Sequence, residues 1–420
     1  MPKNKIDLKH LPLIFILLFI ISLILIFTLF NRYFFVPKIL MLSLILIAAA
    51  LLGRLQLFIR DWFIFISFIY LFDSLRGTIY ILTCKLNLPV YTLYVIKIEK
   101  FLFGNIPSLV LQNWLLKTDS HSHFSWLEKF LTIIHGSHFI IFLFIGFMIW
   151  LYKSYFFPIY RNSFYLVVFF GILGYFIVPT VPPWMASTLF NLFPPIIRFN
   201  VIIFNLAIPD ITSGFDVNPI AAMPSLHAAF PVLCSLLLWR LYKWKAFPFY
   251  LYAFLVIFTI VYTGDHYVTD ILAGMILTIV CYLIAFRIKE APSESGPLKT
   301  ITSWSKEISF VHIKKQLMIG SLILIIGISI GSINKNQFEN NPISYNLYVP
   351  KYIDFFNDEE NYKNDYQVQY YFGNYYYYKK EYKKGLFYFE RCLNLSKNEA
   401  EKKLAQQGIN ACNQLSSQKN

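Results

Sequence analysis

The sequence predicts an all-α protein that crosses a membrane many times and ends in a small helical tail. Of its 420 residues, 57% are hydrophobic and only 14% are charged, a charged share well below the roughly 25% of soluble domains. Apolar runs long enough to span a bilayer recur along most of the chain. From about residue 331 the composition shifts to Asn, Tyr, Lys and Glu, so the membrane part ends there.

The apolar runs predict nine membrane helices. We expect them at about 11–30, 37–58, 62–83, 131–151, 162–179, 224–241, 247–264, 267–286 and 316–333. The first run is too long for the apolar part of a signal peptide and no small-residue cleavage site follows it, so we interpret it as a membrane helix. The predicted organisation is N-terminal membrane helices (1–58), a central membrane domain (59–290), a loop with the last membrane helix (291–333) and a soluble helical tail (334–420).

The net charge of +14 does not indicate a nucleic-acid partner. Many basic residues cluster in short loops between apolar runs, such as Arg54 and Arg60, Lys153 and Arg161. If every predicted span crosses, these loops share one side, which the positive-inside rule makes cytoplasmic. Lys38 is a minor exception on the other face. We therefore expect a multi-pass protein of a bacterial-type inner membrane.

Two motifs beside apolar runs carry the chemistry. They are Pro224-Ser225-Leu226-His227 and His266-Tyr267-Val268-Thr269-Asp270, and the alternation of spans puts both on the non-cytoplasmic face. His266 and Asp270 are four residues apart and share one face of a helix. An imidazole backed by a carboxylate is a base or nucleophile, and a second imidazole can protonate a leaving group. The motifs predict phosphoryl transfer without a metal or another cofactor.

These motifs resemble a known family. Residues 222–229 (Ala-Met-Pro-Ser-Leu-His-Ala-Ala) and 264–270 (Gly-Asp-His-Tyr-Val-Thr-Asp) are similar to the second and third signatures of the type-2 phosphatidic acid phosphatase superfamily. The closer similarity is to its inositol phosphorylceramide synthase and sphingomyelin synthase branch. Shorter similarities lie at 60–62, 73–77, 137–139 and 179–184, and the resemblance covers about residues 50–290. It implies that 59–290 is the catalytic domain, with a six-helix core.

The resemblance also implies roles for three residues. His266 would attack phosphorus and form a phosphohistidine, Asp270 would hold the other ring nitrogen, and His227 would protonate the leaving alkoxide. Because Pro224 suits the first turn of a helix, backbone N–H groups around Ser225 would point at the phosphate, as helix N-termini favour anions.

The sequence departs from the phosphatase branch at its phosphate-binding arginines. No Lys…Arg-Pro signature precedes the motifs, and Thr259 and Ile260 occupy the positions of a usual Ser-Arg pair. The synthase branch also lacks them, which favours a transferase. Charge must then come from elsewhere, and Arg76 is a candidate, although it could equally form a structural bridge to Asp73. The full set of phosphate- or substrate-binding candidates is Ser225, Arg76, His138 and Asp265, and for His138 a purely structural role is an alternative.

Three functions remain open at this point. The first is a lipid phosphotransferase that moves an inositol-phosphate type head group between lipids. The second is a phosphatase of lipid phosphates or diphosphates on the same scaffold. The third is a transporter or non-catalytic scaffold, which the intact histidine motifs disfavour.

The expected partners are lipid substrates in the bilayer. Residues 366–395 of the tail resemble one tetratricopeptide repeat, or are a generic amphipathic helix pair. We expect the tail either to bind another protein or to pack on the membrane domain.

Overall fold

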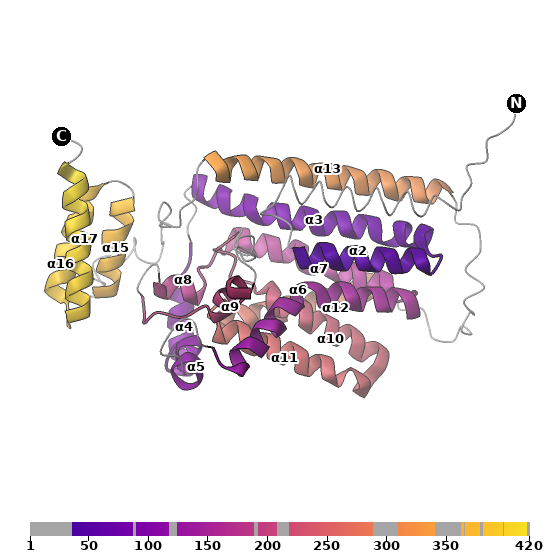
Figure 1. Ribbon diagram of the computed structural model, residues 1–420, viewed down its shortest axis with the longest axis horizontal. Coiled ribbons are helices and arrows are strands. Elements are labelled where there is room, and N and C mark those ends of the chain that lie inside the picture. The colour runs from indigo at the N-terminus through magenta and orange to yellow at the C-terminus, as the bar shows by residue number, and fades with distance from the viewer. Residues whose placement is uncertain are drawn as a thin grey trace, which may run out of the picture.

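The computed structural model describes residues 36–86, 90–116, 124–188, 192–207, 218–288, 310–340, 363–364, 366–378, 381–397 and 399–417. Within these ranges the chain is helical and forms no β-strand. Long helices run side by side along the long axis of the molecule, and short helices and the C-terminal tail gather at one end (Figure 1). The predicted all-α architecture is confirmed.

The long helices form the membrane bundle. They are α2 (Val36–Leu51), α3 (Leu55–Lys85), α6 (Trp126–Tyr152), α7 (Phe157–Ile177), α10 (Leu226–Tyr242), α11 (Phe247–Tyr262), α12 (Val268–Ile288) and α13 (Phe310–Asn340). In the described part of the chain, six helical segments are long and apolar enough to cross a membrane. One of the six, Leu226–Tyr262, contains both α10 and α11, which pack on each other across a short 3-10 turn. The protein is therefore a polytopic membrane protein.

The boundaries of the first two described helices differ from the prediction. The expected span 37–58 is wrong at its end, because α2 stops at Leu51 and α3 already begins at Leu55. Gly53 turns the chain with a left-handed φ of 67°, which glycine adopts at little cost. The helix α3 continues through Arg60 and Asp61, whose side chains pair with each other at 2.8 Å. The expected span 11–30 lies outside the described residues.

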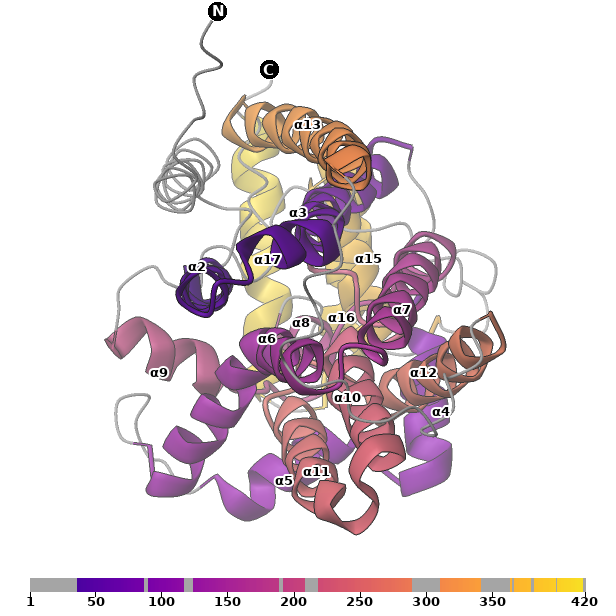
Figure 2. The same cartoon turned by 90° about the vertical axis from the view of Figure 1, so that its right-hand side faces the viewer.

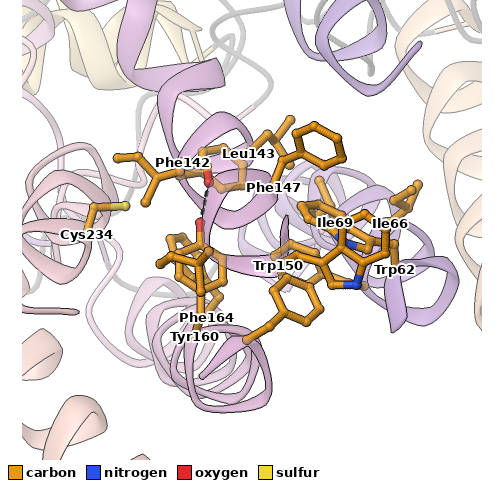
Figure 3. Close-up of a cluster of buried hydrophobic side chains, with 14 of the residues drawn as sticks. Trp62, Ile66, Ile69, Phe142, Leu143, Phe147, Trp150, Tyr160, Phe164 and Cys234 are labelled. Carbon is orange, nitrogen blue, oxygen red and sulfur yellow. Dashed lines mark hydrogen bonds between the residues drawn. The ribbon is translucent and has the colours of Figure 1, made fainter. Parts of the chain in front are cut away.

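The bundle is organised around α10, which contacts α6, α7, α11 and α12, while α13 packs along α3 (Figure 2). Aromatic side chains fill the space between α3, α6 and α7, among them Trp62, Trp150 and Phe164 (Figure 3). In the same cluster Tyr160 donates a hydrogen bond to the carbonyl oxygen of Phe142. Since lipid tails are as apolar as these side chains, such close packing is the main force that holds membrane helices together.

One end of the bundle collects the short basic loops. Arg54 at the start of α3 donates to the carbonyl oxygen of Leu151 at the end of α6, at 3.4 Å. Arg161 in the first turns of α7 donates to the carbonyl oxygen of Asp61, also at 3.4 Å. Arg240 near the end of α10 lies 6.0 Å from the ring of Phe286 near the end of α12. We call this the basic end, and the two histidine motifs lie at the opposite end.

Four short helices cover that opposite end. They are α4 (Leu93–Phe103), α5 (Pro107–Leu115), α8 (Pro183–Thr188) and α9 (Phe199–Ala207). Isolated backbone bridges join Thr180 to Tyr91 and to Ala221, so three connecting segments are tied together. Phe101 and Trp114 are 85% and 73% exposed, as expected for aromatic side chains at a membrane interface. We call these four helices and their connections the roof.

The tail contains three helices, α15 (Tyr366–Tyr378), α16 (Tyr382–Leu395) and α17 (Glu399–Ser417). The ring of Phe389 lies so close to Gly373 and Gly408 that a Cβ atom at either glycine would be within 2.7 Å of it. Phe372 and Tyr388 belong to one buried cluster with residues of α4 and α8. The tail therefore packs on the roof.

Candidate active site

The starts of α10 and α12 lie side by side and set the positions of the motif residues. The hydroxyl of Ser225 accepts the backbone N–H of Ala228 at 3.3 Å, which caps α10. The backbone N–H of Ser225 donates to the carbonyl oxygen of Asp270 at 3.0 Å. A Cβ atom at Gly274 would lie 2.3 Å from the carbonyl oxygen of Ser225, so only glycine allows this approach. The fully buried Ser225 thus holds two helices together.

A tight turn between α11 and α12 carries His266. Gly264 has a left-handed φ of 70°, and the backbone N–H of His266 donates to the carbonyl oxygen of Ile260 at 3.1 Å. From the roof, the backbone N–H of Trp184 donates to the carbonyl oxygen of Gly264 at 3.0 Å. The turn is fixed from both sides, so the imidazole of His266 has a defined position.

The structure brings together His227, His266 and Asp270. Nδ1 of His227 lies 2.7 Å from Nε2 of His266, and Nδ1 of His266 lies 3.6 Å from Oδ2 of Asp270. The same carboxylate oxygen accepts the backbone N–H of Tyr267 at 3.0 Å. Asp270 is fully buried. One imidazole therefore has a carboxylate at one nitrogen and a second imidazole at the other.

Two further histidines of α6 line the same place. The ring centroid of His138 lies 4.7 Å from that of His227 and 5.2 Å from that of His135. Nδ1 of His138 faces the carbonyl oxygen of His135, which is a structural contact. The ring also lies beside His227, so a structural and a functional role of His138 are compatible. With His266, whose ring centroid lies 4.9 Å from that of His227, four imidazoles lie next to one another.

Helices α2 and α3 each contribute one cation, Lys38 and Arg76, to the cavity that the histidines line. Nζ of Lys38 lies 3.0 and 2.9 Å from the two carboxylate oxygens of Asp73, and Nη1 of Arg76 lies 3.7 Å from Oδ1 of the same residue. Arg76 therefore both pairs with Asp73, as in the structural alternative, and lines the cavity described below. Two cations share one carboxylate, which leaves one positive charge in excess.

Lys38 is a candidate site residue that the charge pattern treats only as a minor exception on the non-cytoplasmic face. It is 6% exposed and lines the cavity with Arg76. The sequence feature that could have identified Lys38 is its position beside a long apolar run. An ionisable side chain at membrane depth is costly and usually functional.

Arg198 is a second site residue without a motif. Its Nε and Nη2 lie 3.1 and 3.0 Å from Oδ1 of Asp265, while Asn200 and Thr263 donate to Oδ2 at 3.0 and 2.7 Å. Burial alone raises the pKa of Asp265, but the charges of Arg198 and His135 hold it below its ordinary value. Asp265 is thus an ionised, well-partnered anchor for Arg198.

Helix α4 supports α12 through a buried carboxylate. Glu99 is fully buried, and its Oε1 accepts the backbone N–H and the hydroxyl of Thr269 at 2.8 and 2.7 Å. Burial raises the pKa of Glu99, although these hydrogen bonds oppose the shift. The contact fixes the residue next to Asp270.

Helix α5 contributes Gln112, which binds two backbone segments next to the site. Nε2 of Gln112 donates to the carbonyl oxygens of Ile197 and Tyr262, both at 2.8 Å. Oε1 of Gln112 accepts the backbone N–H of Ile197 at 2.9 Å. One amide therefore fixes both the segment that carries Arg198 and the end of the helix that precedes His266.

A cavity opens between the bundle and the roof. Its volume is about 880 Å³ including its open mouth. Its polar lining includes Lys38, Arg76, His138, Arg198, His227 and His266. The side chain of Ser225 is not part of this lining. Among the described residues no group of three His, Cys, Asp or Glu side chains is arranged to hold a metal ion.

The cavity combines a paired imidazole, a carboxylate and three cations within one water-accessible pocket inside apolar helices. Such a lining suits an anionic phosphoryl group. In agreement, residues 93–284 match the family model of the PAP2 superfamily. The resemblance to the type-2 phosphatidic acid phosphatases is thereby confirmed, and it supports an enzyme of the phosphatase or phosphotransferase type.

Two curated relatives are synthases. The chain is 28% identical over 150 residues to inositol phosphorylceramide synthase catalytic subunit aur1 of Schizosaccharomyces pombe, which covers 34% of this chain and 35% of the relative. It is 32% identical over 126 residues to phosphoinositol dihydroceramide synthase of Bacteroides thetaiotaomicron, which covers 27% of this chain and 40% of the relative. The chain thus spans about two fifths or less of the relatives it matches. No solved structure matches it.

The contacts of Gln112 generate a prediction. Replacing Gln112 with Leu removes the partner of the carbonyl oxygen of Tyr262 and of the backbone N–H of Ile197, whereas the carbonyl oxygen of Ile197 still accepts from Phe199. A buried group left unpaired in this way costs about 1–3 kcal/mol. We expect a lower thermal unfolding midpoint in detergent and weaker substrate binding, because Arg198 loses its support. The matched control is Asn113→Leu, since Asn113 is the exposed neighbour. Equal midpoints for the two variants would contradict this role of Gln112.

Proposed function

We propose that the protein is a membrane lipid phosphotransferase that uses His266 as the nucleophile. The observation that carries the proposal is the arrangement around His266, with Nε2 facing His227 at 2.7 Å and Nδ1 facing Asp270 at 3.6 Å. The names of the two relatives suggest the substrates, a phospholipid donor with an inositol-phosphate head group and an acceptor with a lipid hydroxyl.

In the first step, the lone pair on Nε2 of His266 forms a bond to the phosphorus of the donor. The bond from phosphorus to the oxygen of the donor's glycerol lipid breaks, and protonated His227 gives its proton to that oxygen. The ring of His266 becomes a cation, which the buried carboxylate of Asp270 stabilises. Because Nε2 of His266 and Nδ1 of His227 now face each other directly, the phosphoryl group must separate the two rings when it binds.

In the second step, neutral His227 takes the proton from the hydroxyl of the acceptor. The acceptor oxygen bonds to phosphorus, the bond between phosphorus and His266 breaks, and both histidines return to their starting states. Holding the acceptor beside the phosphohistidine in a pocket that limits water favours transfer over hydrolysis.

The charges of the cavity favour a phosphodiester donor. Thr259 and Ile260, at the positions of the usual Ser-Arg pair, are fully buried, and the hydroxyl of Thr259 donates to the carbonyl oxygen of Leu255 at 2.6 Å. They offer no charge to a substrate. Lys38 and Arg76 together leave one positive charge beyond Asp73, which matches the single negative charge of a diester better than the dianion of a monoester.

We further propose that catalysis takes place at the non-cytoplasmic face of a bacterial-type inner membrane. The support is that Arg54, Arg161 and Arg240 meet at the basic end, and that the site lies at the opposite end. The positive-inside rule makes the basic end cytoplasmic.

The transfer proposal is tested by product identity. Purified protein incubated with labelled phosphatidylinositol should form a new inositol-phosphate lipid only when ceramide or diacylglycerol is added. His266→Ala should abolish this product, and Asp270→Asn should slow it about 10²–10⁴-fold, the usual size of such contributions. His312→Ala in α13 is the histidine control and should keep the wild-type rate. Faster, acceptor-independent release of inorganic phosphate from phosphatidic acid would instead establish a phosphatase.

The sidedness proposal is tested by labelling intact cells with a membrane-impermeant maleimide. Asn413 in α17 and Lys245 between α10 and α11 are both exposed, and single cysteines there sample opposite ends. In a cysteine-free variant, we expect Asn413→Cys to label and Lys245→Cys to label only after lysis, with the cysteine-free variant itself as background. The reverse pattern would place the site in the cytoplasm.

A further inference from the structure

The start of α12 does not carry a capping side chain of its own. The first N–H groups of an α-helix have no partner within the helix, and in α10 the hydroxyl of Ser225 accepts one of them. The matching position just before α12 is Tyr267, and tyrosine is not among the residues that cap helix N-termini. The N–H groups in the first turn of α12 therefore need acceptors from other positions.

Two carboxylates divide these N–H groups between them. Oδ2 of Asp270 accepts the backbone N–H of Tyr267 at 3.0 Å. Oε1 of Glu99 accepts the backbone N–H and the hydroxyl of Thr269 at 2.8 and 2.7 Å, and the backbone of Val268 also forms a hydrogen bond with Glu99. The cap of α12 thus comes largely from a side chain of α4, which lies 170 residues away along the chain.

The carboxylate of Asp270 has to serve His266 as well as its own helix. The oxygen that accepts from Tyr267 also lies 3.6 Å from Nδ1 of His266. Aspartate side chains readily bind free N–H groups of neighbouring residues, and Val268 and Thr269 are in the same turn as Asp270. If their N–H groups were free, they would compete with His266 for this carboxylate.

The side chain of Glu99 is committed to α12. It is fully buried, and its Oε2 has no hydrogen-bond partner in the described structure. Burying a carboxylate is costly unless hydrogen bonds compensate, and those of Glu99 come from the start of α12. Glu99 does not line the cavity, so any effect it has on the reaction passes through α12.

We propose that Glu99 is a positioning residue, which occupies the N–H groups of Val268 and Thr269 and thereby keeps the carboxylate of Asp270 on His266. This inference rests on the proposed function and extends it to a residue of the roof. Without Glu99, Asp270 turns to the freed N–H groups and the imidazole of His266 loses its carboxylate. The chemical step then slows, whereas binding of the donor is unchanged.

The position of Asp270 can be measured in the resting protein. Full-length protein in detergent is prepared with isotope-labelled histidine, and the ring nitrogen signals of His266 are identified by their loss in His266→Ala. We expect Glu99→Ala to move the Nδ1 signal in the same direction as Asp270→Asn, because both remove the carboxylate from that nitrogen. Lys100→Gln, at the exposed neighbour of Glu99, should leave the signal in place.

The effect on the reaction is measured in a single turnover. The protein is mixed with donor lipid labelled at phosphorus, without acceptor, at increasing donor concentrations. Glu99→Ala should lower the maximal rate of labelling about 10–100-fold, which is part of the ~10²–10⁴-fold that a general acid–base group typically contributes. The donor concentration at half the maximal rate should stay the same, as should both values in Lys100→Gln.

Two further variants separate positioning from general stability. Glu99→Ala combined with Asp270→Asn should be no slower than Asp270→Asn alone, because Glu99 acts through Asp270. Glu99→Gln keeps an oxygen that can accept the same hydrogen bonds, so it should retain most of the wild-type rate and the His266 signal. If Glu99→Ala does not fold, Glu99→Asp withdraws the carboxylate from α12 and should show the same dependence on Asp270.

An unchanged His266 signal in Glu99→Ala would overturn the inference, as would an additional loss of rate in the double variant or a loss in Glu99→Gln as large as in Glu99→Ala. The signal does not depend on turnover. A shifted signal in a protein that never becomes labelled would contradict the proposed function, whereas labelling of Glu99→Ala at the wild-type rate would contradict the role of Glu99 alone.

Discussion

The close approach of the first turns of α10 and α12 is the contact on which the site depends. It requires a glycine at Gly274, because any Cβ there would meet the carbonyl oxygen of Ser225 at 2.3 Å. The backbone bond from Ser225 to Asp270 then aligns the two helix starts. His227 comes from one helix start, Asp270 from the other, and His266 from the turn just before α12. If the helices moved apart, the three side chains would separate even though every motif residue remained.

Buried charge is the second constraint. Separating an ion from water inside a membrane is costly unless it is paired, and each cation of the cavity has a carboxylate within 4 Å: Asp73 for Lys38 and Arg76, Asp265 for Arg198. These pairs offset the cost of the buried charges and leave a small positive excess that suits a phosphodiester. The roof helices α4 and α5 take part through hydrogen bonds that Glu99 accepts and that Gln112 donates and accepts. The tail packs on the roof.

Local patterns in the sequence predicted part of this arrangement. The apolar runs gave the helices of the bundle, and spacing within each motif brought His266 near Asp270 and placed His227 at a helix start. The missed residues all act through contacts between distant segments. Lys38 and Asp73 are 35 residues apart, Arg198 and Asp265 are 67 apart, and Gln112 and Tyr262 are 150 apart. No local pattern encodes such pairs. The engagement of Asp265 by Arg198 is a contact of this kind, whereas the cap that the hydroxyl of Ser225 forms on α10 is a local contact with Ala228.

The central claim is that His266 carries the phosphoryl group between donor and acceptor. Its most direct measurement is to mix the protein with donor lipid labelled at phosphorus, without acceptor, and to stop the reaction in alkali, in which phosphohistidine is stable. We expect the label on the peptide that contains His266, and we expect acid to release it. Acceptor added before the alkali should also remove the label from the protein. Label that persists in His266→Ala, or normal product formation with no label on the wild-type protein at any time, would contradict it.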